Sequence, residues 1–374
     1  MQCTVVGTGA VSAAGADLAA QWQTYRSGRG RWTVDARSGL PVYPAAPLPE
    51  VPRLNDFAQG RRLDRASLLA LHAARQAVDA AGWHDRDFAI LVGCSRGPTG
   101  NWEDSFGRYT ATGVAPARTS PDTTLGSIGF ALADYFGTTS LVSSLSVTCS
   151  SGFHALLHGV ALLRAGMVER VLVGGTEAAL TPFTLAQLRA LRVYARPPAG
   201  GVALVCRPLS TPPSGMVIGE GAAFLALTLA SGTAAGPQLA VGFAREGGTS
   251  STGITPDGQA LQQAMRMATE QRGSIPKLVI AHAPGTARGD EAERAAIQAV
   301  FGALPTTSLK WATGHTFGAS GPLGLVAALQ MLEQQQVIGL PYGEMLPPLA
   351  QLQSVLVNAT GFGGNAVSVH ATLG

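Results

Sequence analysis

Charge is scarce in this sequence. Charged residues make up 13% of the 374 residues, the formal net charge is +3 and no block of like charges occurs, so wholesale binding to nucleic acid or to a membrane surface is not expected. Long apolar runs are also missing. None reaches about 18 residues, and no basic N-terminal segment precedes one, so we expect neither a transmembrane helix nor a signal peptide. Lysine is rarer still, because only Lys277 and Lys310 occur among 26 basic residues.

Cysteine is equally sparse. The four cysteines, Cys3, Cys94, Cys149 and Cys206, are far apart and include no CxxC pair, so the sequence predicts neither a zinc site nor a disulfide framework. This usage is typical of a protein of the reducing cytoplasm. A dinucleotide-binding fingerprint is missing too, because the glycines of "GTGAVSAAG" do not fall as GxGxxG. We therefore expect no metal and no nucleotide cofactor.

What the sequence does have is an alternation of short apolar runs with longer helical patterns. The runs "CTVVGTG", "FAILVGC" and "RVLVGG" predict strands, and "RASLLALHAARQAVDAAG" predicts a helix. A second set follows, with "AAFLALTLA", "KLVIAHA" and "VLVNATG" as strands and "LQQAMRMATEQRG" and "LVAALQMLEQQ" as helices. The pattern predicts an α/β protein with two similar halves, about 1–207 and 208–374, that share one core.

Cys149 stands where an apolar run meets a helical pattern, in "SSLSVTCSSGFHALLHGVALLRAG". Phe153, Leu156, Val160 and Leu163 repeat at helical spacing, which predicts that Cys149 lies in the first turn of a helix. A helix N-terminus favours a thiolate, so this position suits a nucleophile. The alternative is a buried cysteine that only fills the core, as cysteine often does.

Two histidines follow apolar runs in glycine-rich turns, His282 in "LVIAHAPGTARGDEAE" and His315 in "LKWATGHTFGASG". Lys310 precedes His315 by five residues. Together with Cys149 these residues fit an acyl-thioester site, in which the cysteine takes the acyl group. The two imidazoles would then donate to the carbonyl oxygen of a second thioester, where negative charge develops if a carboxylate leaves as CO2.

These segments resemble the β-ketoacyl-acyl-carrier-protein synthases, or ketosynthases, of the thiolase superfamily, over nearly the whole chain. "VTCSSGFHAL" is similar to the family's nucleophile segment, and "VLVGGTEAALTP" is similar to the strand after it. "GMVIGEGAAFLAL" resembles the opening of the second half, and "TGFGGNA" resembles the C-terminal glycine-rich gate. The resemblance implies the thiolase fold, an α/β fold with five layers, α-β-α-β-α, built from two similar halves.

The family's catalytic residues map onto this chain one by one. "HAPGTARGDEAE" meets the family pattern HGTGTxxGDxxE, so His282 takes the histidine position, with Ala283 and Pro284 as departures. A register with Pro284 at the histidine position would imply an inactive site, but it breaks the spacing to the later Gly-Asp pair. "SLKWATGHTFGASG" matches the family's lysine and second histidine, which are Lys310 and His315 here.

The resemblance implies a decarboxylating condensing enzyme. Cys149 would accept an acyl chain from the phosphopantetheine arm of an acyl carrier protein, so the enzyme itself needs no cofactor. The backbone N–H groups of Cys149 and Phe362 would form the oxyanion hole, with Gly361 and Gly363 in the same gate. The two histidines would bind the malonyl thioester oxygen and support loss of CO2, and Lys310 would bias the local charge.

Partners also follow from the resemblance. Arg61 and Arg62, in "AQGRRLDRASLL", are candidate contacts to the acidic carrier protein, because related synthases place basic residues there. An ordinary solvated loop is the alternative. The chain should form a homodimer, or a heterodimer with a second ketosynthase-like subunit.

Gly324 bears on the pathway. Many fatty-acid-type members carry glutamate at this position, nine residues after the second histidine, whereas modular polyketide members carry glycine. The glycine favours polyketide or other specialised metabolism. Two other functions stay open: an acyltransferase without decarboxylation, which Pro284 keeps open, and a non-catalytic partner subunit that resembles a chain-length factor, against which Cys149 argues.

Overall fold

The computed structural model describes residues 3–196, 204–229, 236–247, 254–344, 346 and 351–373. Its strands are β1 (Cys3–Ser12), β2 (Thr33–Val34), β3 (Pro41–Tyr43), β4 (Ala89–Gly93), β5 (Val142–Leu145), β6 (Arg170–Glu177), β7 (Ile218–Gly219), β8 (Gly221–Leu229), β9 (Gln238–Arg245), β10 (Leu278–Ile280), β11 (Thr306–Thr307), β12 (Ser354–Gly361) and β13 (Asn365–Thr372). Its helices are α1 (Leu18–Ser27), α2 (Pro52–Arg61), α3 (Arg65–Ala80), α4 (Thr99–Thr112), α5 (Thr119–Thr123), α6 (Gly126–Phe136), α7 (Ser151–Arg164), α8 (Pro182–Ala190), α9 (Gln259–Arg272), α10 (Ala287–Phe301), α11 (Lys310–Thr313) and α12 (Ser320–Gln334), with a 3₁₀ turn η1 (Phe317–Ala319).

Two half-sheets make up the large sheet. Its strand order within the described chain is β11-β10-β12-β13-β9-β1-β8-β6-β4-β5. The halves meet where the start of β1 pairs with the start of β9, Cys3 with Leu239 and Thr4 with Gln238. This short pairing lets the sheet divide into β5-β4-β6-β8-β1 on one side and β9-β13-β12-β10-β11 on the other.

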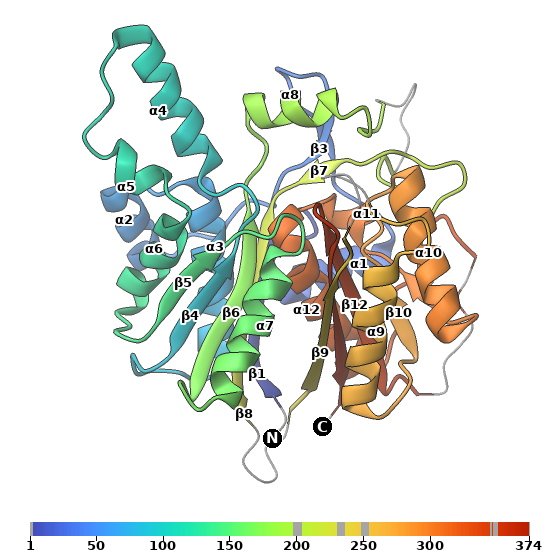
Figure 1. Cartoon of the computed structure of the whole chain (residues 1–374). Coiled ribbons are helices and arrows are strands. Elements are labelled where there is room, and N and C mark those ends of the chain that lie inside the picture. The colour runs from blue at the N-terminus through green and yellow to red at the C-terminus, as the bar shows by residue number, and fades with distance from the viewer. Residues whose placement is uncertain are drawn as a thin grey trace.

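Helices cover both half-sheets and also separate them (Figure 1). α3 and α6 pack on the outer face of the first half-sheet, α9 with α10 beside it covers the second, and α7 and α12 lie between the two. α3 approaches β1 so closely that a Cβ at Gly7 or Gly9 would lie 2.2 Å from a backbone oxygen of the helix. The predicted five-layered thiolase fold is confirmed.

One hydrophobic cluster runs through both halves. It includes Leu156 of α7, Leu325 of α12, Val173 of β6 and Val357 of β12, all buried. The inner helices are therefore the shared core, since each fully buried leucine or valine stabilises the fold by about 1.5–3 kcal/mol. No helix within the described ranges is long and apolar enough to cross a membrane.

β8 belongs to the first half-sheet, although its sequence resembles the opening of the second half. It pairs antiparallel with β1 on one side and with β6 on the other. The apolar run predicts a buried strand but carries no information on which strands lie beside it. The division at 207/208 stays a prediction, and this pairing favours a later one, after Leu229.

The parallel strands bring the candidate residues to one edge. β4 pairs in parallel with β5 and β6, and β10 pairs in parallel with β11 and β12. The carboxyl ends of parallel strands meet at one edge of a sheet, where ligands commonly bind. The segments that follow these strands carry Cys149, His282, Lys310 and Phe362.

Candidate active site

Cys149 lies in the turn between β5 and α7. The helix begins at Ser151, so the cysteine precedes it by two residues rather than lying in its first turn. Thr148, just before it, has a φ of 51°, in the left-handed region that residues other than glycine rarely adopt. This bend turns the chain from strand to helix and places Cys149 at the top of α7, with a side chain that is 8% exposed.

Two histidines lie beside this cysteine. Nε2 of His315 is 3.2 Å from Sγ of Cys149, and Nδ1 of the same ring is 3.3 Å from Oγ of Ser320. The His282 ring lies 5.2 Å from the His315 ring, at an interplanar angle of 89°. The structure therefore brings together three residues that the sequence places far apart.

Lys310 and Glu293 hold the backbone of His282. The ammonium group of Lys310 donates to the carbonyl oxygen of His282. The carboxylate of Glu293 accepts the N–H of His282 at 2.8 Å and that of Ala283 at 2.6 Å, and it also accepts a bond from the Asn358 amide at 3.0 Å. These contacts fix the turn after β10 and leave the imidazole of His282 facing His315.

Ala283 occupies a position where the family pattern has glycine. Its φ is 21°, at the edge of the left-handed region that favours glycine, so the departure from the pattern places strain on the backbone. The bond from its N–H to Glu293 holds that conformation. His282, rather than Pro284, is the residue that lies beside His315.

Burial controls protonation in this site. Burial, and next the negative charge of Glu177, raise the pKa of the Cys149 thiol to about 12, although the positive charges of Lys310 and Arg96 lower it. The thiolate that we expect at a helix N-terminus is therefore not the resting form. Burial, and next the positive charge of Lys310, hold the pKa of both imidazoles well below 6.5. The resting site therefore holds a thiol and two neutral imidazoles.

The gate residues lie at the end of β12. A Cβ at Gly361 would lie 2.2 Å from Oγ1 of Thr148, so only glycine lets β12 approach the turn before the nucleophile. Gly363 has a φ of 83°, which glycine adopts without strain. Phe362 lies between them and lines the same cavity as Cys149.

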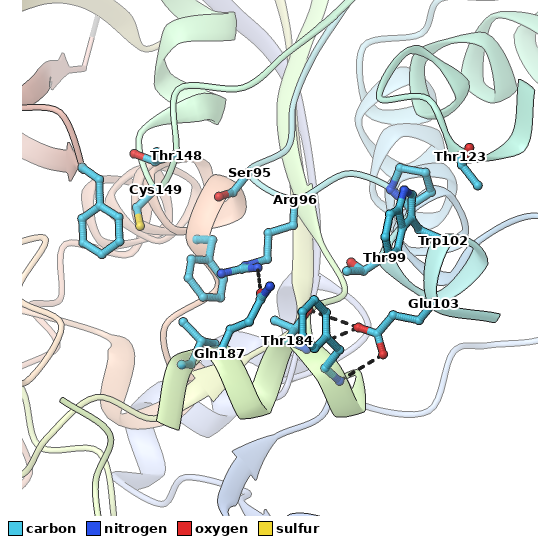
Figure 2. Close-up of a pocket in the computed structure, with 15 residues that line it drawn as sticks. Ser95, Arg96, Thr99, Trp102, Glu103, Thr123, Thr148, Cys149, Thr184 and Gln187 are labelled. Atoms are coloured by element: carbon cyan, nitrogen blue, oxygen red, sulfur yellow. Dashed lines mark hydrogen bonds between the residues drawn. The ribbon is translucent and has the colours of Figure 1, made fainter. Parts of the chain in front are cut away.

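A cavity of about 460 Å³ opens onto Cys149 (Figure 2). Phe317 and Phe362 line it together with the cysteine. The remaining lining mixes apolar and polar side chains from the segment after β4, the turn before Cys149 and helices α4, α5 and α8; it includes Pro98, Trp102, Phe183 and Leu188 beside Ser95, Arg96, Thr99, Glu103, Thr123, Thr148, Thr184 and Gln187. The cavity has room for an acyl chain on the cysteine.

Two family models match the chain. The β-ketoacyl synthase N-terminal domain matches residues 3–231, and the β-ketoacyl synthase C-terminal domain matches residues 239–341. The chain belongs to the β-ketoacyl synthase family. Such a synthase is an acyl-transferring enzyme. The first match ends just beyond β8, in agreement with the pairing of that strand in the first half-sheet.

Relatives of this synthase span its length. The ketoacyl synthase alpha subunit of the tetracenomycin polyketide synthase of Streptomyces glaucescens is 27% identical, over 96% of this chain and 94% of its own. The 3-oxoacyl-[acyl-carrier-protein] synthase 2 of Staphylococcus aureus strain N315 is 27% identical, over 98% and 97%. A solved ketosynthase, in complex with its type II polyketide synthase acyl-carrier protein, has a TM-score of 0.84 at 21% identity over 100% and 99% of the chains, which shows the common fold.

Glu177, at the end of β6, is a buried residue of the synthase that sequence reasoning did not single out. Its carboxylate accepts the backbone N–H groups of Ser95 at 2.8 Å, Arg96 at 3.1 Å and Gly318 at 3.2 Å. It therefore ties the loop after β4 to η1, beside the nucleophile. Burial raises the pKa of Glu177 to about 7.

Replacing Glu177 by glutamine should change how stability depends on pH. Its pKa in the folded state lies above the ordinary value of 4.5, so ionisation favours the unfolded state. Protonated Glu177 makes its full contribution to the free energy of unfolding below about pH 4.5, and this contribution is lost as the pH rises through 7. Between pH 5 and pH 8 the wild type should therefore lose about 2–3 kcal/mol of its free energy of unfolding relative to the Glu177→Gln variant. Urea denaturation at both pH values measures this shift, and a constant difference would contradict it.

Arg61 and Arg62 do not line the cavity of Cys149. Arg61 ends α2, with Nη1 2.9 Å from the carboxylate of Asp134 and its guanidinium 5.6 Å from the centre of the Phe57 ring. Arg62 caps the helix in a left-handed conformation. Both line a separate cavity of about 160 Å³, so their contact with a carrier protein stays a prediction.

The synthase shows no arrangement of three or more His, Cys, Asp or Glu side chains that could hold a metal ion, within the ranges that the structure describes. Its four cysteines are all free thiols. The expectation that it uses neither a metal nor a cofactor of its own stays a prediction.

Proposed function

We propose that the chain catalyses a decarboxylative condensation between an acyl group held on Cys149 and a malonyl unit delivered on an acyl carrier protein. The observation that carries this proposal is the arrangement of two neutral imidazoles at the nucleophile, with His315 at 3.2 Å from the sulfur and His282 at 5.2 Å from His315, ring to ring. A cysteine that only fills the core needs neither histidine and opens onto no cavity.

Acyl transfer is the first step. The sulfur of Cys149 attacks the carbonyl carbon of the donor thioester, and its proton passes to Nε2 of His315. The new carbon–sulfur bond forms as the bond to the carrier's sulfur breaks, and the carrier leaves as a thiol with the proton. The high pKa of the buried thiol makes this coupled transfer necessary, because few molecules are ionised at neutral pH.

Decarboxylation and condensation form the second step. The bond between the malonyl C2 and its carboxylate breaks, CO2 leaves, and the electron pair forms an enolate whose oxygen accepts N–H bonds from His282 and His315. C2 then attacks the acyl carbonyl, and the carbon–sulfur bond to Cys149 breaks. The Cys149 thiolate takes up one proton from solvent, which balances the negative charge of the carboxylate that was lost as CO2. Ser320 beside Nδ1 of His315 can donate or accept, so Nε2 can act as acceptor in the first step and as donor in the second.

The proposed partners are an acyl carrier protein and a second chain. The complex of a carrier protein with its ketosynthase, which shares this fold, supports the first. α4 projects from the body of the molecule (Figure 1) and has no buried residue, and it exposes Trp102, Phe106 and Tyr109, an apolar face that a second chain would cover. The proposed location in the reducing cytoplasm rests on the unpaired cysteines.

We propose a polyketide or other specialised pathway over fatty acid synthesis. A Cβ at Gly324 would lie 3.1 Å from Cγ1 of Val357, so a glutamate would not fit there unless its neighbours moved. The tetracenomycin relative belongs to a polyketide synthase, whereas the staphylococcal relative is a 3-oxoacyl synthase, so both pathways occur among proteins of this similarity.

Intact-mass analysis of the purified protein tests the proposal. The protein is offered a panel of acyl carrier proteins, with and without malonyl carrier, and CO2 and the extended product are measured alongside. We expect an acyl adduct without malonyl carrier, and its discharge with release of CO2 when malonyl carrier is added. An adduct that discharges to an amine or alcohol without CO2 would favour the acyltransferase, and no adduct at all would favour the partner subunit.

Reversal of charge at Arg61 and Arg62 tests the docking of the carrier. Glutamate at both positions should raise the KM for acyl carrier protein while leaving turnover of an acyl-pantetheine almost unchanged, and the advantage of the wild type should shrink as salt is added, because charges at an interface rim mainly affect encounter. Steady-state kinetics with both substrates at several salt concentrations measure this. Equal losses with both substrates would indicate a structural role, and no loss would place the docking surface elsewhere.

A further inference from the structure

The cavity beside Cys149 contains a cation. If the proposed function holds, this cavity receives the acyl chain, and Arg96 lines it together with the nucleophile. In Figure 2 the Arg96 side chain points from the loop after β4 toward Gln187 on α8, and these two residues lie between Cys149 on one side of the view and Trp102 and Glu103 on the other. Phe183, Leu188 and Phe362 give the cavity an apolar lining that suits a hydrocarbon chain, so the guanidinium of Arg96 is the group that a plain hydrocarbon chain would not match.

Contacts hold Arg96 in this place. The Glu177 carboxylate accepts its backbone N–H at 3.1 Å, and Nη1 of its side chain donates to Oε1 of Gln187 at 2.7 Å. The guanidinium also lies 5.6 Å from the centre of the Phe317 ring, a cation–π distance. These contacts fix the backbone of Arg96, the position of its charge and the plane of its guanidinium before a substrate enters.

Arg96 keeps free donors. It forms no ion pair with any carboxylate of the described residues, and Gln187 takes only one of its five N–H groups. An alkyl chain that fills the cavity would strip water from the remaining donors and replace none of their bonds, which is unfavourable. A chain with an oxygen atom would accept a charge-assisted hydrogen bond there instead.

The carboxylate in the cavity does not complement a cationic substrate. Glu103 already accepts the hydroxyl of Thr181 at 2.5 Å, the N–H of Phe183 at 3.1 Å and the N–H of Thr184 at 3.3 Å, and so caps the start of α8. These bonds hold its carboxylate against α8. Of the two charged side chains that line the cavity, Arg96 is the one with N–H donors left for a substrate.

We propose that Arg96, supported by Gln187, makes this synthase select acyl chains that carry a neutral acceptor oxygen, a keto or hydroxyl group, beyond the thioester carbonyl, in preference to unsubstituted alkyl chains. This names the acyl-substrate class of the condensation proposed above. Arg96 is a specificity residue and takes no part in breaking or forming the bonds at Cys149.

Matched acyl chains test this selection. Wild-type protein is offered pantetheine thioesters of hexanoate, 3-oxohexanoate, 5-oxohexanoate and glutarate, and the rate of acylation of Cys149 is followed by intact mass. We expect at least one oxo chain to react about tenfold faster than hexanoate, the size of effect that one hydrogen bond to a charged group supplies. Arg96→Met should lose this preference, with the oxo chain slowed and hexanoate as fast as before or faster.

Two further variants complete the design. Arg96→Lys keeps the charge and should keep part of the preference. Arg266→Met removes a similar arginine, which donates to Gln262 at 3.2 Å on the exposed surface of α9, and should keep the preference in full. The change in the ratio of the two rates separates selection from misfolding, because a disturbed fold would slow both chains alike.

The outcomes distinguish this inference from the function on which it rests. Equal rates for oxo chains and hexanoate in the wild type, or an unchanged preference in Arg96→Met, would overturn the role of Arg96 while acylation of Cys149 still stood. A stronger preference for glutarate than for either oxo chain would overturn the assignment of a neutral oxygen. No acylation by any thioester or by any acyl carrier protein would overturn the proposed function itself.

Discussion

Cys149→Ala should take up no acyl group from any carrier protein and should make no condensation product. Cys149 is the thiol that lines the cavity, and Nε2 of His315 lies 3.2 Å from its sulfur. The other cysteines, Cys3, Cys94 and Cys206, have no exposed surface, and burial raises the pKa of each thiol. No second thiol is therefore placed to replace the nucleophile.

Intact mass, followed by mapping of the acylated peptide, measures this loss. Cys206→Ala is the matched control, because it removes an equally small buried thiol from a different cluster and should keep the adduct. Cys149→Ser is a second probe, since it keeps the shape of the turn and should be acylated far more slowly than the wild type. An acyl mass on Cys149→Ala that disappears in the Cys206 variant would show that the nucleophile has been assigned to the wrong residue.

Local sequence patterns predicted which segments form helices and strands, but they did not predict which strands lie side by side. The helical runs that became α3, α9 and α12 and the apolar runs that became β4, β6, β10 and β12 are confirmed, because their periodicity reflects the face that each element buries. The place of β8 could not be read in the same way. Its residues are buried on both faces, and its partners β1 and β6 are set by packing across the whole chain.

The same distinction applies to the candidate site, where some residues stand in local motifs and others are brought together only by the tertiary fold. Cys149, His282, Lys310 and His315 each stand in a local motif, and the structure brings them together. The contact of Arg96 with Gln187, by contrast, joins residues 91 apart in the sequence. Arg96 itself stands in a glycine- and proline-rich stretch with no periodic pattern, so periodicity does not indicate that its side chain faces the nucleophile.

His282→Ala should slow release of CO2 from malonyl carrier protein by about 10²–10³-fold while self-acylation largely survives. The imidazole is a donor to the charge that develops on the enolate oxygen, whereas His315 is the residue in contact with the sulfur of Cys149. The variant should fold, because Lys310 and Glu293 bind the backbone of residue 282 and not its ring.

Release of CO2 and uptake of the acyl group are therefore measured separately in the same preparation. His84→Ala, a change at an exposed histidine, is the control and should leave both rates unchanged. The pKa of the His282 imidazole lies well below 6.5, so the ring is neutral from pH 6.5 to 8 and the ratio of wild-type to variant rates should stay constant across that range. A rate of CO2 release that does not fall would mean that His282 donates nothing to the enolate, and would favour the acyltransferase. Loss of acyl uptake along with CO2 release would instead place His282 in the first step, as a second base for the thiol.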